Sequence, residues 1–187
     1  FEKSFSVIST IIKEEYTSIE EGLIIDSVIV PNNGKMMADV SVQKAIVSAV
    51  QATHHGVFRM SPDIDTLVES SSSLARVIIK DGEFITQSLQ RSSVESSRDD
   101  VADTVRAPFD LIGCSVVQNG EYPGWQPNSN SPILDIMKSI YIQRYKEEPK
   151  VKACHAGLEC GILSKHLVGV DMISFGPNIR AAHSPDE

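Results

Sequence analysis

The stretch LVESSSSLARVIIKDGEFITQSLQR, from Leu67 to Arg91, decides the fold. Two runs rich in β-branched and apolar residues flank Asp81-Gly82, a dipeptide that favours a tight two-residue hairpin turn. The sequence therefore predicts two antiparallel strands, Leu67–Ile79 and Phe84–Arg91, joined at this turn.

The serine run Ser70–Ser73 leaves two interpretations open. Consecutive serines are typical of a linker. Val68 precedes the run, however, and the apolar segment Leu74–Ile79 follows it directly, which favours a continuous strand. We expect a strand here, with the linker as the alternative.

Further elements are expected before and after the hairpin. Three helices are predicted. The first begins near residue 1, where apolar residues recur at helical spacing and form a stripe. The second runs from about Met36 to Gln51, and the third runs from the capping residues Ser96-Ser97 to about Gly113. Short strands are expected over 23–30 and over Gly56–Met60. The residues of the first stripe are Phe1, Phe5, Ile8, Ile12 and Tyr16.

The character of the chain changes after Asn119. Residues 120–131 are too rich in proline, glycine and asparagine for a regular element, and Ser131-Pro132 then predicts the start of a helix. Its expected buried face consists of Ile133, Ile136, Met137, Ile140 and Tyr141. A short strand at 151–154, a helix and a strand near 171–177 would complete an α/β layer.

Composition excludes several classes of protein. The chain has 187 residues, a hydrophobic fraction of 41% and a net charge of −8, which fit a globular protein rather than a disordered one. Its 17 basic residues are scattered, so a nucleic-acid surface is not expected. An odd number of cysteines, no signal-like segment and no bilayer-length apolar run indicate a cytoplasmic protein without a membrane span.

His183, near the C-terminus, is a candidate metal ligand, but the sequence around it does not supply the other ligands that a metal ion needs. A catalytic zinc needs about three protein ligands and a carboxylate that deprotonates its water. The other histidines and cysteines show no HExxH, CxxC or HxxxH spacing, so the sequence offers no complete site. A solvated loop histidine is the alternative. The candidates weighed are His54, His55, His155, His166, Cys114, Cys154 and Cys160.

Three ordered blocks carry a resemblance to a known family. They are YPGWQP at 122–127, HAGLECG at 155–161, and ISFGP at 173–177 running into AHSPDE at 182–187. The blocks resemble the C-terminal part of the Xaa-His dipeptidases, also called aminoacyl-histidine dipeptidases or carnosinases, of the dinuclear zinc metallopeptidase superfamily. The resemblance is strong from Gly120 onward and looser before it.

The resemblance implies the architecture of an interrupted two-domain enzyme. The expected fold class is α/β, with residues 1–120 forming part of an α+β lid and dimerisation domain and residues 121–187 the C-terminal part of the catalytic domain. The chain would begin within the lid and end just after the last metal ligand. Two zinc ions, or other divalent metals, a dipeptide substrate and a homodimer are implied.

The same resemblance implies roles for five residues. His183 corresponds to a metal ligand, whereas the general base and the remaining ligands would precede residue 1, so the chain alone is expected to be inactive. Arg91 suits bidentate capture of a substrate carboxylate, and Gly157 and Glu159 would line the substrate pocket. Ser73, the fourth substrate-binding candidate, stands where the family usually has asparagine, and a serine can donate one hydrogen bond but lacks the reach and second polar group of an amide. An exposed arginine, a turn glycine and a helix-terminal charge are the structural alternatives.

Two other classes of function remain open. The lid's sheet and helices would also suit a stand-alone dimerisation or binding module. An aminoacylase or deacetylase of the same superfamily would share the fold while acting on a different substrate.

Overall fold

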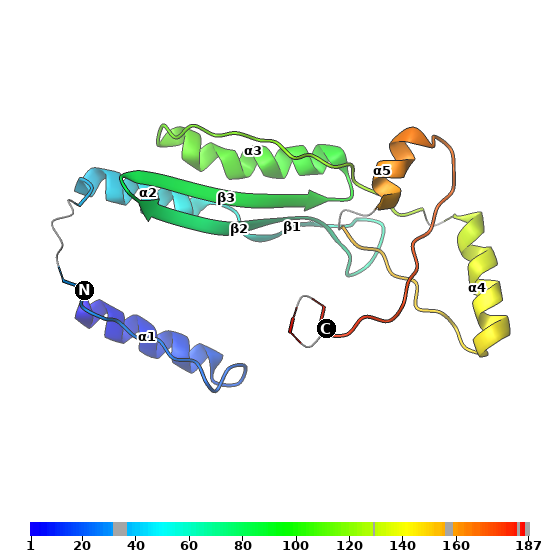
Figure 1. Cartoon of the computed structure of the whole chain (residues 1–187), viewed down its shortest axis with the longest axis horizontal. Coiled ribbons are helices and arrows are strands. Elements are labelled where there is room, and N and C mark those ends of the chain that lie inside the picture. The colour runs from blue at the N-terminus through cyan, green and yellow to red at the C-terminus, as the bar shows by residue number, and fades with distance from the viewer. Residues whose placement is uncertain (32–36, 129, 156–158, 183, 186–187) are drawn as a thin grey trace. The chain divides into compact units, whose positions relative to one another are not determined.

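A computed structural model describes residues 1–31, 37–128, 130–155, 159–182 and 184–185. Contacts divide the chain into two units, Phe1–Met37 and Ala38–Glu187, and the boundary near Gly120 predicted from the sequence stays a prediction. The elements in chain order are α1 (Glu2–Tyr16), α2 (Val40–Ala52), β1 (Gly56–Met60), β2 (Val68–Lys80), β3 (Glu83–Ser92), α3 (Glu95–Leu111), α4 (Pro132–Tyr145) and α5 (Glu159–His166) (Figure 1).

The first unit consists of α1 and the segment after it. The predicted helix is confirmed, and the rings of Phe1 and Phe5 stack at 5.9 Å, but none of its residues is buried. The strand predicted over 23–30 is wrong, because these residues form neither a strand nor a helix. A strand needs a ladder partner for its backbone groups, and apolar composition alone does not supply one.

The hairpin predicted between Leu67 and Arg91 is confirmed. β2 and β3 are antiparallel, and their last pair is Lys80 and Glu83. Asp81 and Gly82 have φ values of 54° and 82°, and two consecutive positive values are those of a type I′ turn, whose twist matches the flanking strands. The serine run lies inside β2, so the strand interpretation is correct and the linker interpretation is wrong.

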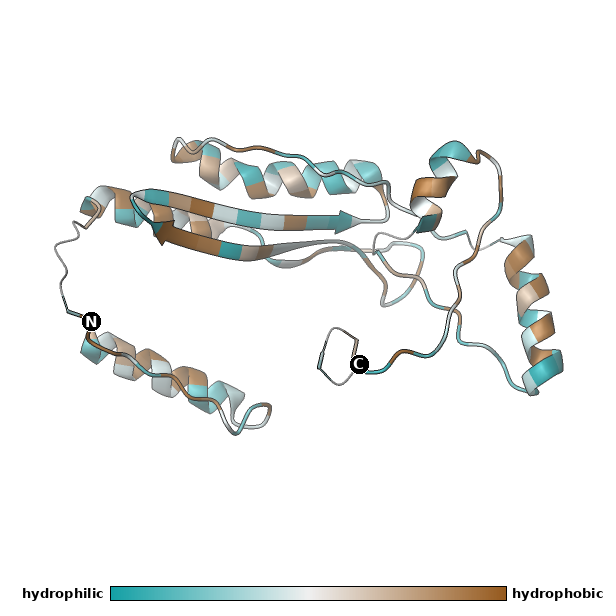
Figure 2. Ribbon diagram, in the orientation of Figure 1, coloured by the Kyte–Doolittle hydropathy of each residue, from teal (hydrophilic) through white to brown (hydrophobic). Residues whose placement is uncertain are grey.

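The sheet has the order β1-β2-β3, α3 packs on one of its faces, and α2 packs against α3. α3 runs along β2 and β3 (Figure 1), and the ring of Phe109 lies 6.3 Å from that of Phe84. In Figure 2, hydrophobic and hydrophilic segments follow one another along β3, and the hairpin end of β2 is hydrophobic over the consecutive residues Val77–Ile79. The buried apolar core among the described residues is small and consists of Ala49, Val101, Val105 and Phe109.

Serines fill much of the contact between α3 and the sheet. Ser70 is fully buried, and its hydroxyl accepts a hydrogen bond from the Ser97 hydroxyl at 3.1 Å. Ser72 accepts from the Gln90 amide at 3.3 Å. Small side chains let the helix approach closely, and the paired hydroxyls avoid the cost of a buried polar group without a partner.

The ends of α3 differ in how well the sequence predicted them. The predicted cap at Ser96-Ser97 is wrong, because the helix begins at Glu95 and Ser97 uses its hydroxyl on Ser70 instead. The predicted end near Gly113 is confirmed. Backbone N–H groups of Gly113 and Cys114 bond to the carbonyls of Asp110 and Phe109, a Schellman motif with glycine in the left-handed conformation.

The start of α4 is also as predicted. Ser131 accepts a hydrogen bond from the Leu134 N–H at 3.2 Å, and Pro132 is the first helical residue. Asp171 accepts from the Ile133 N–H at 3.0 Å and from the Ser131 hydroxyl at 2.8 Å, and these bonds lower the pKa of its carboxyl group. The carboxylate therefore neutralises the helix N-terminus.

Two expectations for residues 121–187 are wrong. No residue on the expected buried face of α4 is buried: Ile136 is 59% and Ile140 51% exposed, whereas Met137 and Tyr141 are half-buried. The strands predicted at 151–154 and near 171–177 are not formed, because the described residues there have no ladder partner. The fold class itself is confirmed, since helices combine with an antiparallel sheet.

Replacing Phe109 by alanine is expected to lower the free energy of unfolding by about 3–5 kcal/mol, because the side chain is 5% exposed and its loss leaves a cavity against the sheet. Urea denaturation followed by circular dichroism measures the change. The matched substitution Phe175→Ala removes a ring that is 77% exposed and should change this free energy by less than about 0.5 kcal/mol. Equal effects of the two substitutions would contradict the assignment of Phe109 to the core.

Candidate functional site on the open face of the sheet

The β2–β3 register places the predicted residues Arg91 and Ser73 on one face of the sheet. Ser71 and Arg91 are direct partners across the two strands. Ser70 points to α3, and side chains alternate along a strand, so Ser71 and Arg91 point to the opposite, open face. Ser73, two residues beyond Ser71, points the same way and is exposed. The structure thus brings together two of the residues predicted to bind substrate.

His155 joins this face from a distant part of the chain. Its Nε2 lies 2.8 Å from the Ser71 hydroxyl in a hydrogen bond. Burial lowers the pKa of His155, and the nearby positive charge of Arg91 lowers it further, so the ring is held neutral near pH 7. The sequence made His155 a candidate metal ligand and placed it in the block expected to line the substrate pocket, but substrate roles there were assigned only to Gly157 and Glu159. Its position at the start of the HAGLECG block, beside the predicted pocket residues, was the available signal.

The segment Tyr122–Trp125 lies between the end of β3 and the start of α5. A Cβ atom on Gly124 would lie 2.5 Å from the carbonyl oxygen of Ser93, and one on Gly161 would lie 2.8 Å from that of Pro123. Real Cβ atoms do not approach so closely, so both positions need glycine for lack of space. The YPGW block therefore sets the distance between α5 and the sheet.

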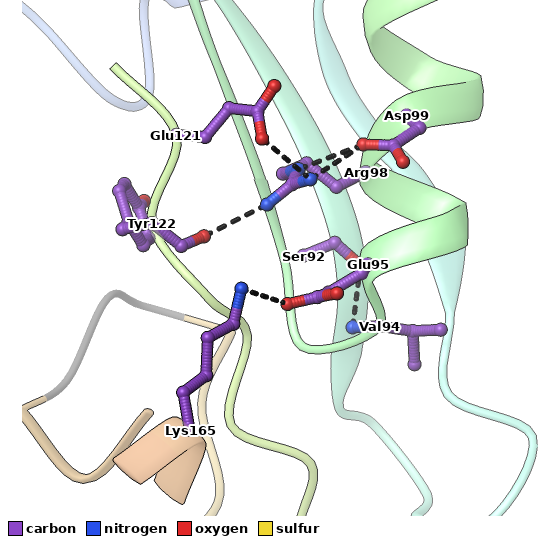
Figure 3. A network of polar contacts seen from close by, with 8 residues as sticks. All are labelled: Ser92, Val94, Glu95, Arg98, Asp99, Glu121, Tyr122 and Lys165. Carbon is purple, nitrogen blue, oxygen red and sulfur yellow. Dashed lines mark hydrogen bonds and ion pairs between the residues drawn. The ribbon is translucent and has the colours of Figure 1, made fainter. Parts of the chain in front are cut away.

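Ion pairs between three elements hold this arrangement together (Figure 3). Arg98, on the first turn of α3, donates a hydrogen bond to the Tyr122 carbonyl at 3.0 Å and lies 3.5 Å from the Glu121 carboxylate. Lys165 of α5 lies 3.0 Å from Glu95 of α3. The Arg98 side chain is 16% exposed and is therefore better shielded from solvent than the Lys165 side chain, which is 55% exposed.

Glu159 begins α5 and its side chain is exposed. The helix predicted between the segments 151–154 and 171–177 is therefore confirmed, and Glu159, within the block, lies at its N-terminus. Gly157 falls outside the described residues. The substrate roles of Gly157, Glu159, Arg91 and Ser73 are not tested by the structure and stay predictions.

The metal ligand predicted at His183 also lies outside the described residues. Among the residues that the structure describes, histidine, cysteine and carboxylate side chains nowhere gather in a group of three that would hold a metal ion. Two of the histidines have other contacts, since His54 bonds to the Val57 carbonyl and His55 accepts from the Leu74 N–H. These residues by themselves do not fit a zinc site.

Comparison with known proteins bears on the resemblance noted in the sequence. The chain is 34% identical over 179 residues to the cytosol non-specific dipeptidase of Escherichia coli (strain K12), an alignment of 95% of the chain and 36% of that protein. It is also similar to the crystal structure of aminoacylhistidine dipeptidase from Vibrio alginolyticus, with a TM-score of 0.83, 31% identity and coverage of 97% of the chain and 37% of that structure. No protein-family model matches the sequence.

These likenesses confirm the resemblance to the aminoacyl-histidine dipeptidases over nearly the whole chain. The chain spans about a third of the length of each relative. No helix in the described part of the chain has the length and apolar character needed to cross a membrane.

Replacing Gly124 by alanine is expected to destabilise the protein by roughly 1–3 kcal/mol, because the added methyl group meets backbone atoms that have no room to move. Thermal unfolding measures the loss. Gly176→Ala is the matched control, since a Cβ there meets no atom within 4 Å, and it should leave the melting temperature nearly unchanged. A tolerated Gly124→Ala would show that the segment does not pack as described.

Replacing Arg91 by glutamine is expected to raise the pKa of His155, since one of the two causes of its depression is removed, while burial still keeps it below the ordinary value. An NMR titration of the imidazole measures this shift. Because the pKa of His155 is lower in the folded protein than in the unfolded chain, protonation of this residue lowers the free energy of unfolding as the pH falls below about 6.5. Arg91→Gln should make this loss of stability smaller. The exposed control Arg180→Gln should leave the His155 titration unchanged.

Proposed function

We propose that this chain is part of a metal-dependent dipeptidase that hydrolyses aminoacyl-histidine dipeptides. The observation that carries the proposal is its similarity, over at least 95% of its length, to two proteins whose names are both those of dipeptidases. One of these names specifies an aminoacyl-histidine substrate, and the other specifies a non-specific dipeptidase. Since Ser73 stands where the family usually has asparagine, a broader range of dipeptides is compatible with the proposal.

Arg91 is the proposed group that recognises the substrate's C-terminal carboxylate. A guanidinium presents two parallel N–H donors to a carboxylate and remains charged at any physiological pH. It lies on the open face of the sheet, where α3 does not cover it. Ser73 on the same face offers one further hydroxyl, and Gly157 and Glu159 of the HAGLECG block are the other proposed pocket residues.

His183 is the proposed zinc ligand of this chain. The described residues do not supply a metal site. In the complete protein, the other ligands and the general base would come from a part that corresponds to the two thirds of the relatives' length not spanned by this chain. Two zinc ions, with other divalent metals as substitutes, are the expected cofactors of the complete enzyme. The 187-residue chain alone is accordingly proposed to be inactive.

The remaining parts of the proposal concern organisation. Residues 1–120 would belong to a lid domain that mediates homodimerisation, and residues 121–187 to the catalytic domain. The proposed location is the cytoplasm, in line with the name of the Escherichia coli relative.

The full-length protein that contains this chain, supplied with Zn²⁺, is expected to hydrolyse β-alanyl-histidine and alanyl-histidine, and the isolated chain is not. Chromatographic assay of released histidine measures both. His183→Ala should lower the rate of hydrolysis by more than about a hundredfold. Removing a metal ligand should reduce activity at least as much as removing a residue that hydrogen-bonds to a ligand, which lowers activity by about 10- to 100-fold. His166→Ala, at an exposed histidine, is the control and should retain activity.

Two results would contradict the proposal. Hydrolysis by the isolated chain at the rate of the full-length protein would show that no other part is needed. A full-length protein that cleaves no member of a dipeptide panel in the presence of zinc would not be a dipeptidase.

A further inference from the structure

The hydrogen bond between Ser71 and His155 connects the sheet to the HAGLECG block at the proposed carboxylate site. Ser71 is on the central strand, directly across from Arg91, and its hydroxyl lies 2.8 Å from the His155 ring. A contact between two segments so far apart in sequence holds one segment against the other. The start of the block is therefore fixed beside Arg91.

The other ring nitrogen of His155, Nδ1, contacts no protein group among the interactions of the described residues. When the Ser71 hydroxyl donates its proton to Nε2, the neutral ring must carry its own proton on Nδ1. That nitrogen is then a hydrogen-bond donor on a ring that is bound to Ser71, the residue directly across the strands from Arg91. Arg91 is near enough to the ring for its charge to lower the pKa of His155.

We propose that His155, oriented by Ser71, donates a hydrogen bond from Nδ1 to the same substrate carboxylate that Arg91 binds, and so determines specificity for a free C-terminal carboxylate. This inference rests on the proposed function, in that it assigns a second residue to the carboxylate site of the dipeptidase. The carboxylate has two oxygens, and one guanidinium leaves further lone pairs on them for a second donor.

The charge state of the ring supports this assignment. Burial and the charge of Arg91 lower the pKa of His155, so near neutral pH the imidazole donates a hydrogen bond without adding a second positive charge that Arg91 would repel. A carboxylate between the two residues offsets the charge of Arg91. Ligand binding should accordingly raise the pKa of His155.

Calorimetric titration of the full-length protein with N-acetyl-L-histidine and with its C-terminal amide tests the proposal. The wild-type protein is expected to bind the acid more tightly than the amide. His155→Ala should weaken binding of the acid about tenfold and leave binding of the amide within about twofold, since only the acid loses a charge-assisted hydrogen bond. His155→Asn, which keeps an N–H donor near the Nδ1 position, should recover part of the loss.

Two further variants separate binding from folding. Ser71→Ala deletes one hydroxyl and should weaken binding of the acid several-fold, because the ring loses its orientation. His166→Gln, at an exposed histidine on α5, should leave both affinities unchanged. A purely structural role of His155 would weaken the acid and the amide equally and would not be rescued by asparagine.

An unchanged preference for the acid in both His155→Ala and Ser71→Ala would overturn the inference. The calorimetric result does not depend on hydrolysis, so the two proposals can fail separately. If the wild-type protein cleaves no dipeptide but loses its preference for the acid in His155→Ala, the proposed function fails and the carboxylate site stands. If hydrolysis is normal and the preference persists in the variants, only the role of His155 fails.

Discussion

The register of the β2–β3 hairpin is the constraint on which the rest of the Ala38–Glu187 unit depends. The positive φ values at Asp81 and Gly82 fix a two-residue turn, and this turn sets the pairing from Lys80 to Arg76. A register shift between Leu74 and Arg76 then brings Ser71 opposite Arg91. A slip by one residue would move every side chain to the other face. Ser70 would then leave α3, and Ser71 and Arg91 would leave the open face.

The two faces of this sheet have opposite roles. The covered face uses serines in place of larger apolar groups, so α3 lies close to the strands and the few apolar side chains, such as Phe109 and Val101, form a compact core. The opposite face carries Arg91, Ser73 and Ser71, which α3 does not cover. The same alternation that builds the core therefore places the polar groups where a ligand has access.

The candidate site also depends on a close approach at two glycines. Gly124 and Gly161 leave no space for a side chain, so the segment before α4 packs tightly between the end of β3 and α5. Arg98 and Lys165 add ionic contacts to the same junction. This packing keeps the HAGLECG block near β2, where His155 meets Ser71.

Elements with local signals could be predicted from the amino-acid sequence alone. The Asp81-Gly82 turn, the Ser131-Pro132 helix start and the glycine that ends α3 each act through their own backbone conformation, so they were predictable from a few neighbouring residues. The three C-terminal blocks also sufficed to indicate the family resemblance. Only the tertiary structure decided which predicted strands had ladder partners, that Ser97 bonds to Ser70 rather than capping α3, and that His155 lies against Ser71. These outcomes depend on contacts between segments far apart in the chain, and no local pattern encodes which distant group will satisfy a hydrogen bond.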